Sequence, residues 1–212
     1  MTEVIEHKLN DEYYQLILTD CLEGVKEAED KGLPLIFSEE GGVRAPKDCS
    51  FVLLSGEGLT DKYLELAICR YYDMPFTIAE SRRLYIREIS VSDLDYLPQE
   101  LKWEKDFTRS YIAAMYKIWG FGLWLLIDKK SGEYIGRAGV GIAEAKKGDL
   151  YELGYEILAP YRRQGYGYEA CRAILEYARE ELGLENLIIR TDASNTAAIA
   201  LAKKLGISPR LL

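Results

Sequence analysis

Residues 151–170 read Tyr-Glu-Leu-Gly-Tyr-Glu-Ile-Leu-Ala-Pro-Tyr-Arg-Arg-Gln-Gly-Tyr-Gly-Tyr-Glu-Ala, and this stretch decides the fold of the second part of the chain. Its first eight residues are typical of a β-strand, and Gly165 and Gly167 begin a predicted helix. The loop between strand and helix carries Arg162 and Arg163. Unpaired backbone N–H groups converge at the partially positive start of a helix. The sequence therefore predicts a site for an anion such as a phosphate, with charge-assisted hydrogen bonds from the arginines.

The same glycines also fit the dinucleotide-binding pattern Gly-x-Gly-x-x-Ala, which would end at Ala170, with Asp192 as the ribose-binding acid. In a dinucleotide-binding fold, however, the first glycine follows its strand almost at once and belongs to a β-α-β unit. Here a longer loop intervenes, and the strands before it are joined by short polar turns that favour antiparallel hairpins. The sequence context therefore disfavours dinucleotide binding.

Hydrophobic periodicity and turn residues predict an α/β succession from residue 84 onward. Ser92 is the expected cap of the first helix. In order, the predicted elements are a strand over 84–89, helices over 92–101 and 108–119, strands over 122–127, 134–143 and 150–158, a helix over 165–182, a strand over 186–191 and a helix over 195–205.

The motif Arg162-Arg163-Gln164-Gly165-Tyr166-Gly167 and this order of elements resemble the Gcn5-related N-acetyltransferases (GNAT) over residues 81–212. The resemblance implies a mixed, mostly antiparallel sheet flanked by helices, acetyl-CoA as cosubstrate without a metal, and acetyl transfer to a primary amine. The acceptor, a small molecule or a protein N-terminus, is left open. Residues implied in cofactor binding are Ile157, Leu158, Arg162, Arg163, Gln164, Gly165, Tyr166, Gly167, Tyr168 and Asn195.

The resemblance also implies roles within this set. The pyrophosphate would lie on the amides of residues 163–168, and an amide near Ile157 or Leu158 would polarise the thioester carbonyl. Asn195 would hydrogen-bond the pantetheine arm, although it is also a plausible helix cap. Glu152 and Glu156 lie on one face of the strand and are candidates for the general base. The alternative for both is a solvated or salt-bridged strand position.

Two features depart from the family pattern. Ala202 stands where many members carry a tyrosine that protonates the thiolate. Family members also continue for two more strands after the stretch that ends here at Leu212, so the strand over 186–191 is expected to have an open edge. We expect a homodimer or the N-terminal module to cover that edge. The alternative function is a catalytically impaired CoA-binding or regulatory protein.

Residues 1–80 are predicted to form a separate small acidic module with the order β-α-β-β-α. They hold 17 acidic and 7 basic side chains, whereas residues 81–212 hold 18 and 20. The predicted elements are strands over 14–19, 34–37 and 51–54 and helices over 22–31 and 60–72. Residues 13–55 weakly resemble the late part of the haloacid dehalogenase fold, with Asp20 at its acidic position. Residues for that family's nucleophile strand and lysine are not found upstream, so we expect a noncatalytic module in which Asp20 caps the following helix.

Composition limits the classes of function. The chain of 212 residues is 48% hydrophobic with a net charge of −8, which is typical of a soluble globular protein and argues against nucleic-acid binding. No apolar run is long enough to span a bilayer, and the N-terminus carries no signal sequence, so a cytoplasmic protein is expected. Four dispersed cysteines and one histidine predict reduced thiols and no metal site.

Overall fold

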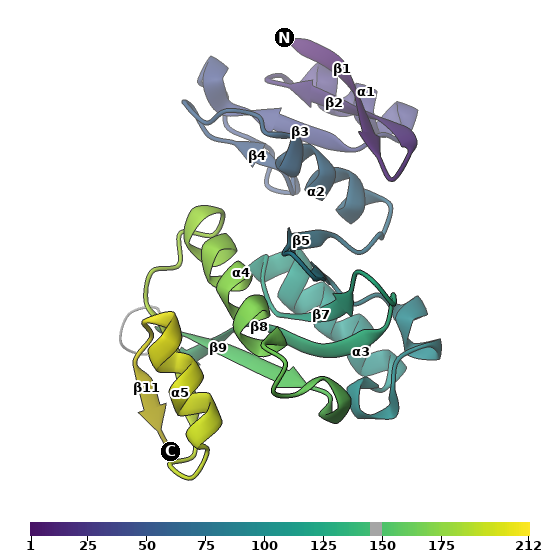
Figure 1. Ribbon diagram of the computed structural model, residues 1–212. Helices are drawn as coiled ribbons and strands as arrows, with labels where there is room; N and C mark the ends of the chain where they lie inside the picture. Colours follow the sequence, from purple (N-terminus) through teal and green to yellow (C-terminus); the bar gives the residue numbers. More distant parts are fainter. Residues whose placement is uncertain (145–149) are drawn as a thin grey trace. The chain divides into compact units, whose positions relative to one another are not determined.

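A computed structural model describes residues 1–144 and 150–212. The chain forms two compact units, Met1–Phe76 and Thr77–Leu212. The boundary lies just before β5 (Thr77–Glu80), whereas the sequence places it at the end of that strand. Each unit has its own sheet, and both are shown in Figure 1.

The first unit is a four-stranded sheet in the order β1-β2-β3-β4, with an antiparallel β1–β2 pair and parallel pairs thereafter. Its core contains Leu16, Ile36, Leu64 and Ile68, which are buried together. The elements are β1 (Thr2–Leu9), β2 (Glu12–Thr19), α1 (Leu22–Lys31), β3 (Leu35–Ser38), η1 (Glu39–Gly41), β4 (Val52–Leu53) and α2 (Asp61–Tyr71).

Two features of this unit differ from the sequence expectation. β1 is an additional strand, whose mostly polar and exposed side chains give little hydrophobic signal. Asp20 does not cap α1, because the N-cap residue is Cys21 and its side chain makes no capping hydrogen bond. Asp20 instead accepts a hydrogen bond from the N-terminal amino group of Met1. All four cysteines are free thiols, and Cys69 and Cys171 are buried.

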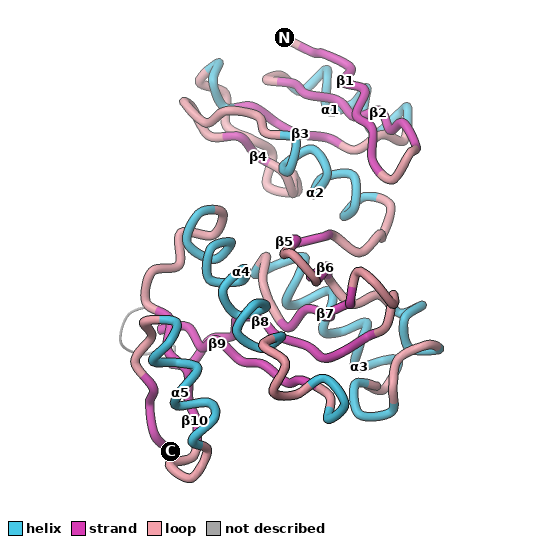
Figure 2. The backbone as a smooth tube through the Cα atoms, in the orientation of Figure 1, coloured by secondary structure: helices cyan, strands magenta, loops and turns pink. Residues whose placement is uncertain are grey.

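The second unit contains a seven-stranded sheet in the order β11-β10-β9-β8-β7-β6-β5 (Figure 2). The pairs from β5 to β9 are antiparallel, and the pairs β9–β10 and β10–β11 are parallel. The predicted mixed, mostly antiparallel sheet is therefore confirmed. Its further strands are β6 (Leu84–Arg87), β7 (Leu123–Asp128), β8 (Tyr134–Glu144), β9 (Leu150–Ile157), β10 (Leu187–Thr191) and β11 (Pro209–Leu211).

The prediction of an open edge at β10 is wrong, because β11 pairs with this strand. Ile189, Arg190 and Thr191 are in register with Pro209, Arg210 and Leu211. The short strand follows α5 (Thr196–Leu205) and the left-handed Gly206 that ends this helix, and its three residues are too few to give a periodic signal. The expected homodimer loses the observation on which it was based and stays a prediction.

The helices of the second unit lie on both faces of the sheet. On one face, Gly167 of α4 (Tyr166–Glu180) packs against Tyr155 of β9. On the other face, Arg137 of β8 lies over the ring of Trp103, and Arg137 is in register with Glu156, the next residue of β9. Adjacent residues of a strand point to opposite faces, so α4 and the segment around Trp103 cover opposite faces. The segment from Trp103 continues into α3 (Lys105–Tyr111) and the π-helix η4 (Ile112–Trp119).

The helix predicted over 92–101 is instead two short 3₁₀ turns, η2 (Val91–Asp95) and η3 (Gln99–Leu101). Ser90, not Ser92, is the N-cap of η2, where it forms a capping box with Asp93. Pro98 separates the two turns, because proline lacks the N–H that would continue a helix and disfavours helical geometry in the residue before it.

Candidate functional site

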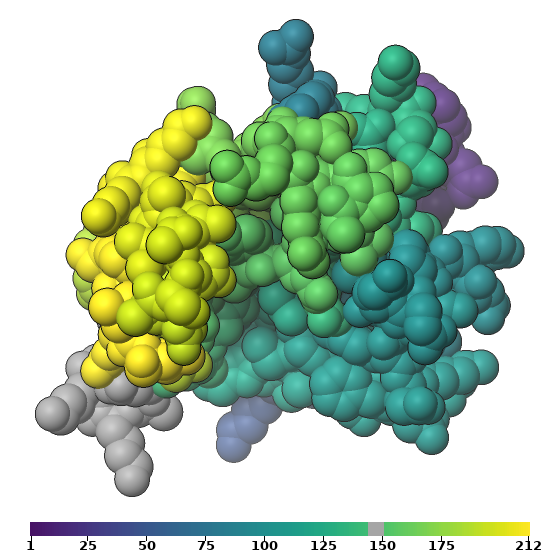
Figure 3. Space-filling model, turned by 60° about the horizontal axis from the view of Figure 1, so that its bottom comes forward, coloured from purple at the N-terminus to yellow at the C-terminus, as the bar shows by residue number. Residues whose placement is uncertain are grey.

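The strands β9 and β10 diverge and leave a cavity between them. They pair only at Tyr151–Leu187 and Glu152–Ile188. Beyond these pairs opens a cavity of about 950 Å³, lined by β9, the loop that leads into α4, the end of β10, and α5. Figure 3 shows the hollow between the yellow surface of the C-terminal segment and the light-green surface of the loop and α4.

The backbone of β9 presents unpaired polar groups to this cavity. The Leu158 amide donates to the Ile135 carbonyl at 2.9 Å, so this residue is hydrogen-bonded to the β8 side. In an antiparallel pair, residues alternate between bonding toward the partner and facing away. The backbone groups of Tyr155 and Ile157 therefore face the cavity, where no described strand pairs with them, and of these groups the Ile157 carbonyl is bonded to the Arg162 side chain. Of the two predicted amide donors, Ile157 faces the cavity and Leu158 does not.

The loop after β9 has a defined, partly left-handed backbone. Arg163 and Gly165 have φ values of 62° and 85°, and Gly165 is the N-cap of α4. Arg162 donates from Nε to the Ile157 carbonyl at 2.7 Å, and Gln164 donates from Nε2 to the Pro160 carbonyl at 2.7 Å. Arg162 thus holds the loop against the end of β9, and Gln164 closes the loop on itself. The first amides of α4 remain as hydrogen-bond donors for an anion.

Gly167 has a different role from Gly165. A Cβ atom added at Gly167 would lie 3.3 Å from the Tyr155 ring and 3.6 Å from a side-chain carbon of Ile157. The missing side chain lets α4 begin directly above β9. As a result, the helix start and the unpaired strand edge border the same cavity.

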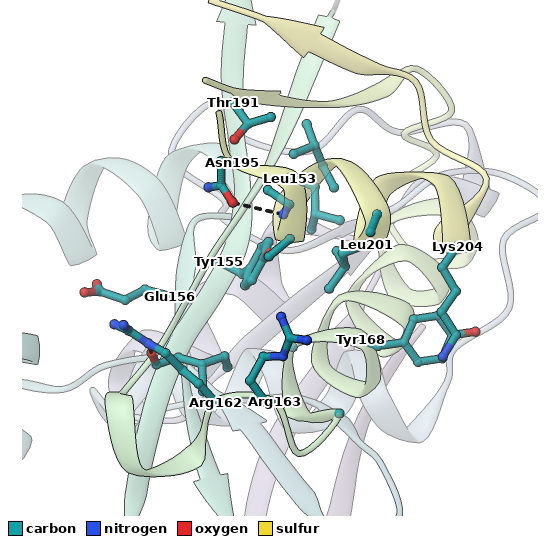
Figure 4. A pocket seen from close by; sticks show the side chains of 18 of the residues that line it. Leu153, Tyr155, Glu156, Arg162, Arg163, Tyr168, Thr191, Asn195, Leu201 and Lys204 are labelled. Carbon is teal, nitrogen blue, oxygen red and sulfur yellow. Dashed lines mark hydrogen bonds between the residues drawn. The ribbon is translucent and has the colours of Figure 1, made fainter. Parts of the chain in front are cut away.

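Cationic and polar side chains surround the cavity (Figure 4). Arg163 rises from the loop toward the middle of the cavity, and Lys204 of α5 lies with its Nζ 4.1 Å from the centre of the Tyr168 ring. Asn195 caps α5, because its Oδ1 accepts from the Ala198 amide at 3.1 Å. This bond leaves the Nδ2 group of Asn195 as a donor for a ligand.

Glu152 and Glu156 are both held in ion pairs with arginine. Glu152 accepts from the Arg190 guanidinium at 2.6 Å, and Glu156 from Arg137 at 2.8 Å. Their side chains are 25% and 40% exposed, respectively. In Figure 4 the Glu156 side chain points away from α5. The salt-bridged strand position anticipated as the alternative is therefore what the structure shows for both residues.

The structure brings most of the predicted residues together. Leu158, Gln164 and Tyr166 do not line the cavity, and the Tyr166 hydroxyl instead donates to Asp128 at 2.9 Å. The predicted residues that line it are Glu152, Glu156, Ile157, Arg162, Arg163, Gly165, Gly167, Tyr168 and Asn195.

Sequence reasoning missed several residues of the lining. The alternation along β9 could have indicated Leu153 and Tyr155, which share the face of Ile157. Lys204 carried a weaker signal, since it lies one helical turn after the lining residue Leu201. Within residues 1–144 and 150–212, no three His, Cys, Asp or Glu side chains gather as metal ligands. No helix in these ranges is both long enough and apolar enough to cross a membrane.

Comparison with known proteins gives a family match over the second unit. Residues 74–208 match the model of the acetyltransferase (GNAT) domain. A solved structure from Bordetella pertussis, described as a GNAT-family acetyltransferase, aligns with a TM-score of 0.50 at 20% identity and covers 59% of this chain and 85% of that one. At this level of sequence identity, the similarity shows a shared fold and nothing more. The proposed resemblance of residues 13–55 to haloacid dehalogenases lies outside the family match and stays a prediction.

Curated relatives are similar over part of their length. YkkB of Bacillus subtilis, an uncharacterized protein, is 32% identical over 91 residues, which are 43% of this chain and 53% of the relative. The FsC-acetyl coenzyme A-N(2)-transacetylase of Aspergillus fumigatus is 34% identical over 95 residues, 42% of this chain and 40% of the relative. The chain thus matches about half the length of these relatives or less. Because the family model spans more than half of the chain and the sheet agrees with it, the chain belongs to the GNAT acetyltransferases.

Proposed function

We propose that the chain transfers an acetyl group from acetyl-CoA to a primary amine, with the cavity between β9 and β10 as the acetyl-CoA site. One observation carries the proposal: the unpaired edge of β9 leads directly to a cationic loop at the N-terminus of a long helix. An extended, amide-containing arm can add to a strand edge, and a pyrophosphate suits a helix start. Acetyl-CoA contains both groups and supplies the activated acetyl thioester.

The residues divide between binding and chemistry. The amides of residues 163–168 would hold the pyrophosphate, and the arm would lie along Tyr155 and Ile157, with Asn195 Nδ2 donating from α5. The Ile157 amide is the remaining predicted donor for the thioester carbonyl, because the Leu158 amide is bonded to Ile135. A fixed donor at this place would stabilise the oxyanion formed during attack.

In the transfer, the amine nitrogen forms a bond to the carbonyl carbon of the thioester and loses a proton. The carbon–sulfur bond breaks. The sulfur leaves as a thiolate and then takes up a proton. Glu156 is the candidate to accept the proton from nitrogen, directly or through water, and Glu152 is the second candidate. Each would act from within its ion pair with arginine. The buried Ala202 offers no acid to the thiolate, so solvent would supply that proton.

A second candidate function is a CoA-binding or regulatory protein without turnover. The ion pairs of Glu152 and Glu156 favour it, because both carboxylates are already engaged by arginine side chains and the Glu156 side chain points away from α5 (Figure 4). The proposal leaves the acceptor of the enzyme open between a small molecule and a protein N-terminal amine.

The two functions are distinguished by measuring CoA affinity by calorimetry and thiol release from acetyl-CoA with a panel of primary amines. The enzyme predicts amine-dependent release above the hydrolysis background, and the regulatory protein predicts binding without release. Glu156→Gln should lower kcat while changing CoA affinity little, and Glu176→Gln on the exposed side of α4 is the matched control. A wild-type chain that binds no CoA would contradict both functions.

A further inference from the structure

The loop at the start of α4 is anchored by side chains from a distant turn of the same unit. Glu169, in the first turn of α4, accepts hydrogen bonds at Oε1 from the Ser81 hydroxyl at 2.8 Å and the Arg83 amide at 2.7 Å. Its Oε2 accepts from Nε and NH2 of Arg83, both at 2.7 Å. The Glu169 side chain is 18% exposed. Its carboxylate is thus saturated by one short segment between β5 and β6.

Arg83 connects this carboxylate to the loop itself. Its NH1 group donates to the Gln164 carbonyl at 3.1 Å, and its guanidinium lies 4.0 Å from the centre of the Tyr166 ring. Gln164 and Tyr166 flank Gly165, the left-handed residue that begins α4. One guanidinium therefore contacts the residues on both sides of the turn that directs the helix amides.

The stacked ring is fixed at its other end. The Tyr166 hydroxyl donates to Asp128 Oδ2 at 2.9 Å, while Asp128 Oδ1 accepts from the amides of Lys130 and Ser131. Burial raises the pKa of Glu169, but the hydrogen bonds from Ser81 and Arg83 outweigh it and hold the pKa below its usual value. The carboxylate consequently stays ionised at neutral pH and keeps the guanidinium in place.

We infer that Arg83 and Glu169 are positioning residues for the anion site: they hold the loop over residues 163–167 in the geometry that directs the α4 amides at a phosphate. The inference rests on the proposed function, because it assigns the phosphates of CoA as the anion. Neither residue needs to touch the ligand. Their effect is to preorganise the donors, which lowers the ordering cost of binding.

Glu169→Gln gives a test in which positioning and simple electrostatics predict opposite signs. Removing a carboxylate beside an anion site should tighten CoA binding if only charge matters. Positioning predicts weaker binding, because glutamine has one acceptor oxygen and one NH2 donor, so it cannot accept from all the donors of Ser81 and Arg83 that Glu169 now satisfies. We expect the Kd for CoA, and for adenosine 3′,5′-bisphosphate, to rise about tenfold, comparable to the loss of one charge-assisted hydrogen bond. The kcat at saturating acetyl-CoA should stay unchanged.

The matched control is Arg82→Ala, which removes a positive charge one residue away from Arg83. Arg82 makes no ion pair among the described residues and should leave the Kd near the wild-type value. Arg83→Lys keeps the charge but loses the planar fork, so it should weaken CoA binding nearly as much as Glu169→Gln. If Glu169→Gln unfolds, the milder variants Arg83→Lys and Ser81→Ala carry the same comparison.

The outcomes distinguish a failure of the proposed function from a failure of the positioning role of Arg83 and Glu169. A wild-type chain that binds neither CoA nor adenosine 3′,5′-bisphosphate overturns the proposed function and this inference with it. Wild-type binding combined with unchanged or tighter binding in Glu169→Gln or Arg83→Lys overturns the inference alone. Equal losses in Arg82→Ala and Arg83→Lys also overturn it, since a residue without these contacts would then matter as much as Arg83.

Discussion

Lys204 is a single residue whose position predicts a measurable contribution to ligand binding. It lies on the cavity side of α5 above the Tyr168 ring, in the same cavity as Arg162 and Arg163. We expect Lys204→Ala to weaken CoA binding about fivefold, or roughly 1 kcal/mol, because it removes one solvent-accessible charge near a multiply charged anion. Calorimetric titration with CoA measures the change.

Its neighbour Lys203 is the matched control, since it has the same charge and helix but does not line the cavity. Lys203→Ala should leave the affinity within experimental error. The Lys204 effect should also shrink as salt is added, because exposed charge interactions are screened. Equal effects of both substitutions would show that Lys204 acts only through net charge.

At the scale of the loop and its helix, Gly165 is required by backbone geometry. Its φ of 85° is strained for an L-residue, so a side chain costs stability even where space exists. We expect Gly165→Ala to lower the free energy of unfolding by about 1–2 kcal/mol. Urea unfolding measures this loss.

Gly141 in β8 is the control glycine, because an added Cβ meets nothing within 4 Å and its φ is not in the left-handed region. Gly141→Ala should be neutral or slightly stabilising. Comparable losses at both positions would remove the backbone argument.

At the scale of the whole molecule, stability in acid depends on a buried ion pair in the second unit. Asp93 is bonded to Arg87 by two hydrogen bonds of 2.6 and 2.9 Å, and its side chain is 6% exposed. Burial raises the pKa of Asp93, but hydrogen bonds from Arg87, Ser90 and Tyr134 outweigh it and lower the pKa overall. A lowered pKa stabilises the fold above the unfolded value near 4, and this contribution is lost as pH falls through the folded pKa.

Asp93→Asn should therefore lower the free energy of unfolding by about 3 kcal/mol at pH 7, because the largely covered Arg87 guanidinium loses its buried counter-charge. The difference from wild type should shrink below pH 4, and urea unfolding across pH measures it. Asp106→Asn is the control, since Asp106 is 95% exposed in its pair with Arg109. A constant difference down to pH 2 would contradict the role of the Asp93 charge.

The division of the chain into two units predicts that the second unit can fold as a separate fragment. All residues that line the cavity lie between Glu152 and Lys204, within the unit Thr77–Leu212. A fragment with these bounds should fold and bind CoA with the affinity of the full chain, because its sheet and core are its own. Circular dichroism and calorimetry measure both properties. A folded fragment with much weaker CoA binding would show that the first unit contributes to the site.

The sequence by itself determined what depends on local interactions. The strand, the loop glycines and the helix start over residues 151–170 were predictable, because turn chemistry and periodicity act over a few neighbours. The positions of α1 and α5 followed from the same signals, and both helices end at left-handed glycines. The weakly apolar β1 and the short β11 carried no such signal and are held by their partner strands.

Only the tertiary structure decided which groups form the site. The cavity exists because β9 and β10 separate after two residue pairs, a consequence of sheet geometry that no local pattern encodes. The ion pairs of Glu152 and Glu156 depend on cross-strand neighbours, and Arg83 reaches Gln164 across 81 positions of sequence. Such contacts arise from packing between distant segments. Periodicity shows which face a residue occupies, whereas packing decides what that residue meets.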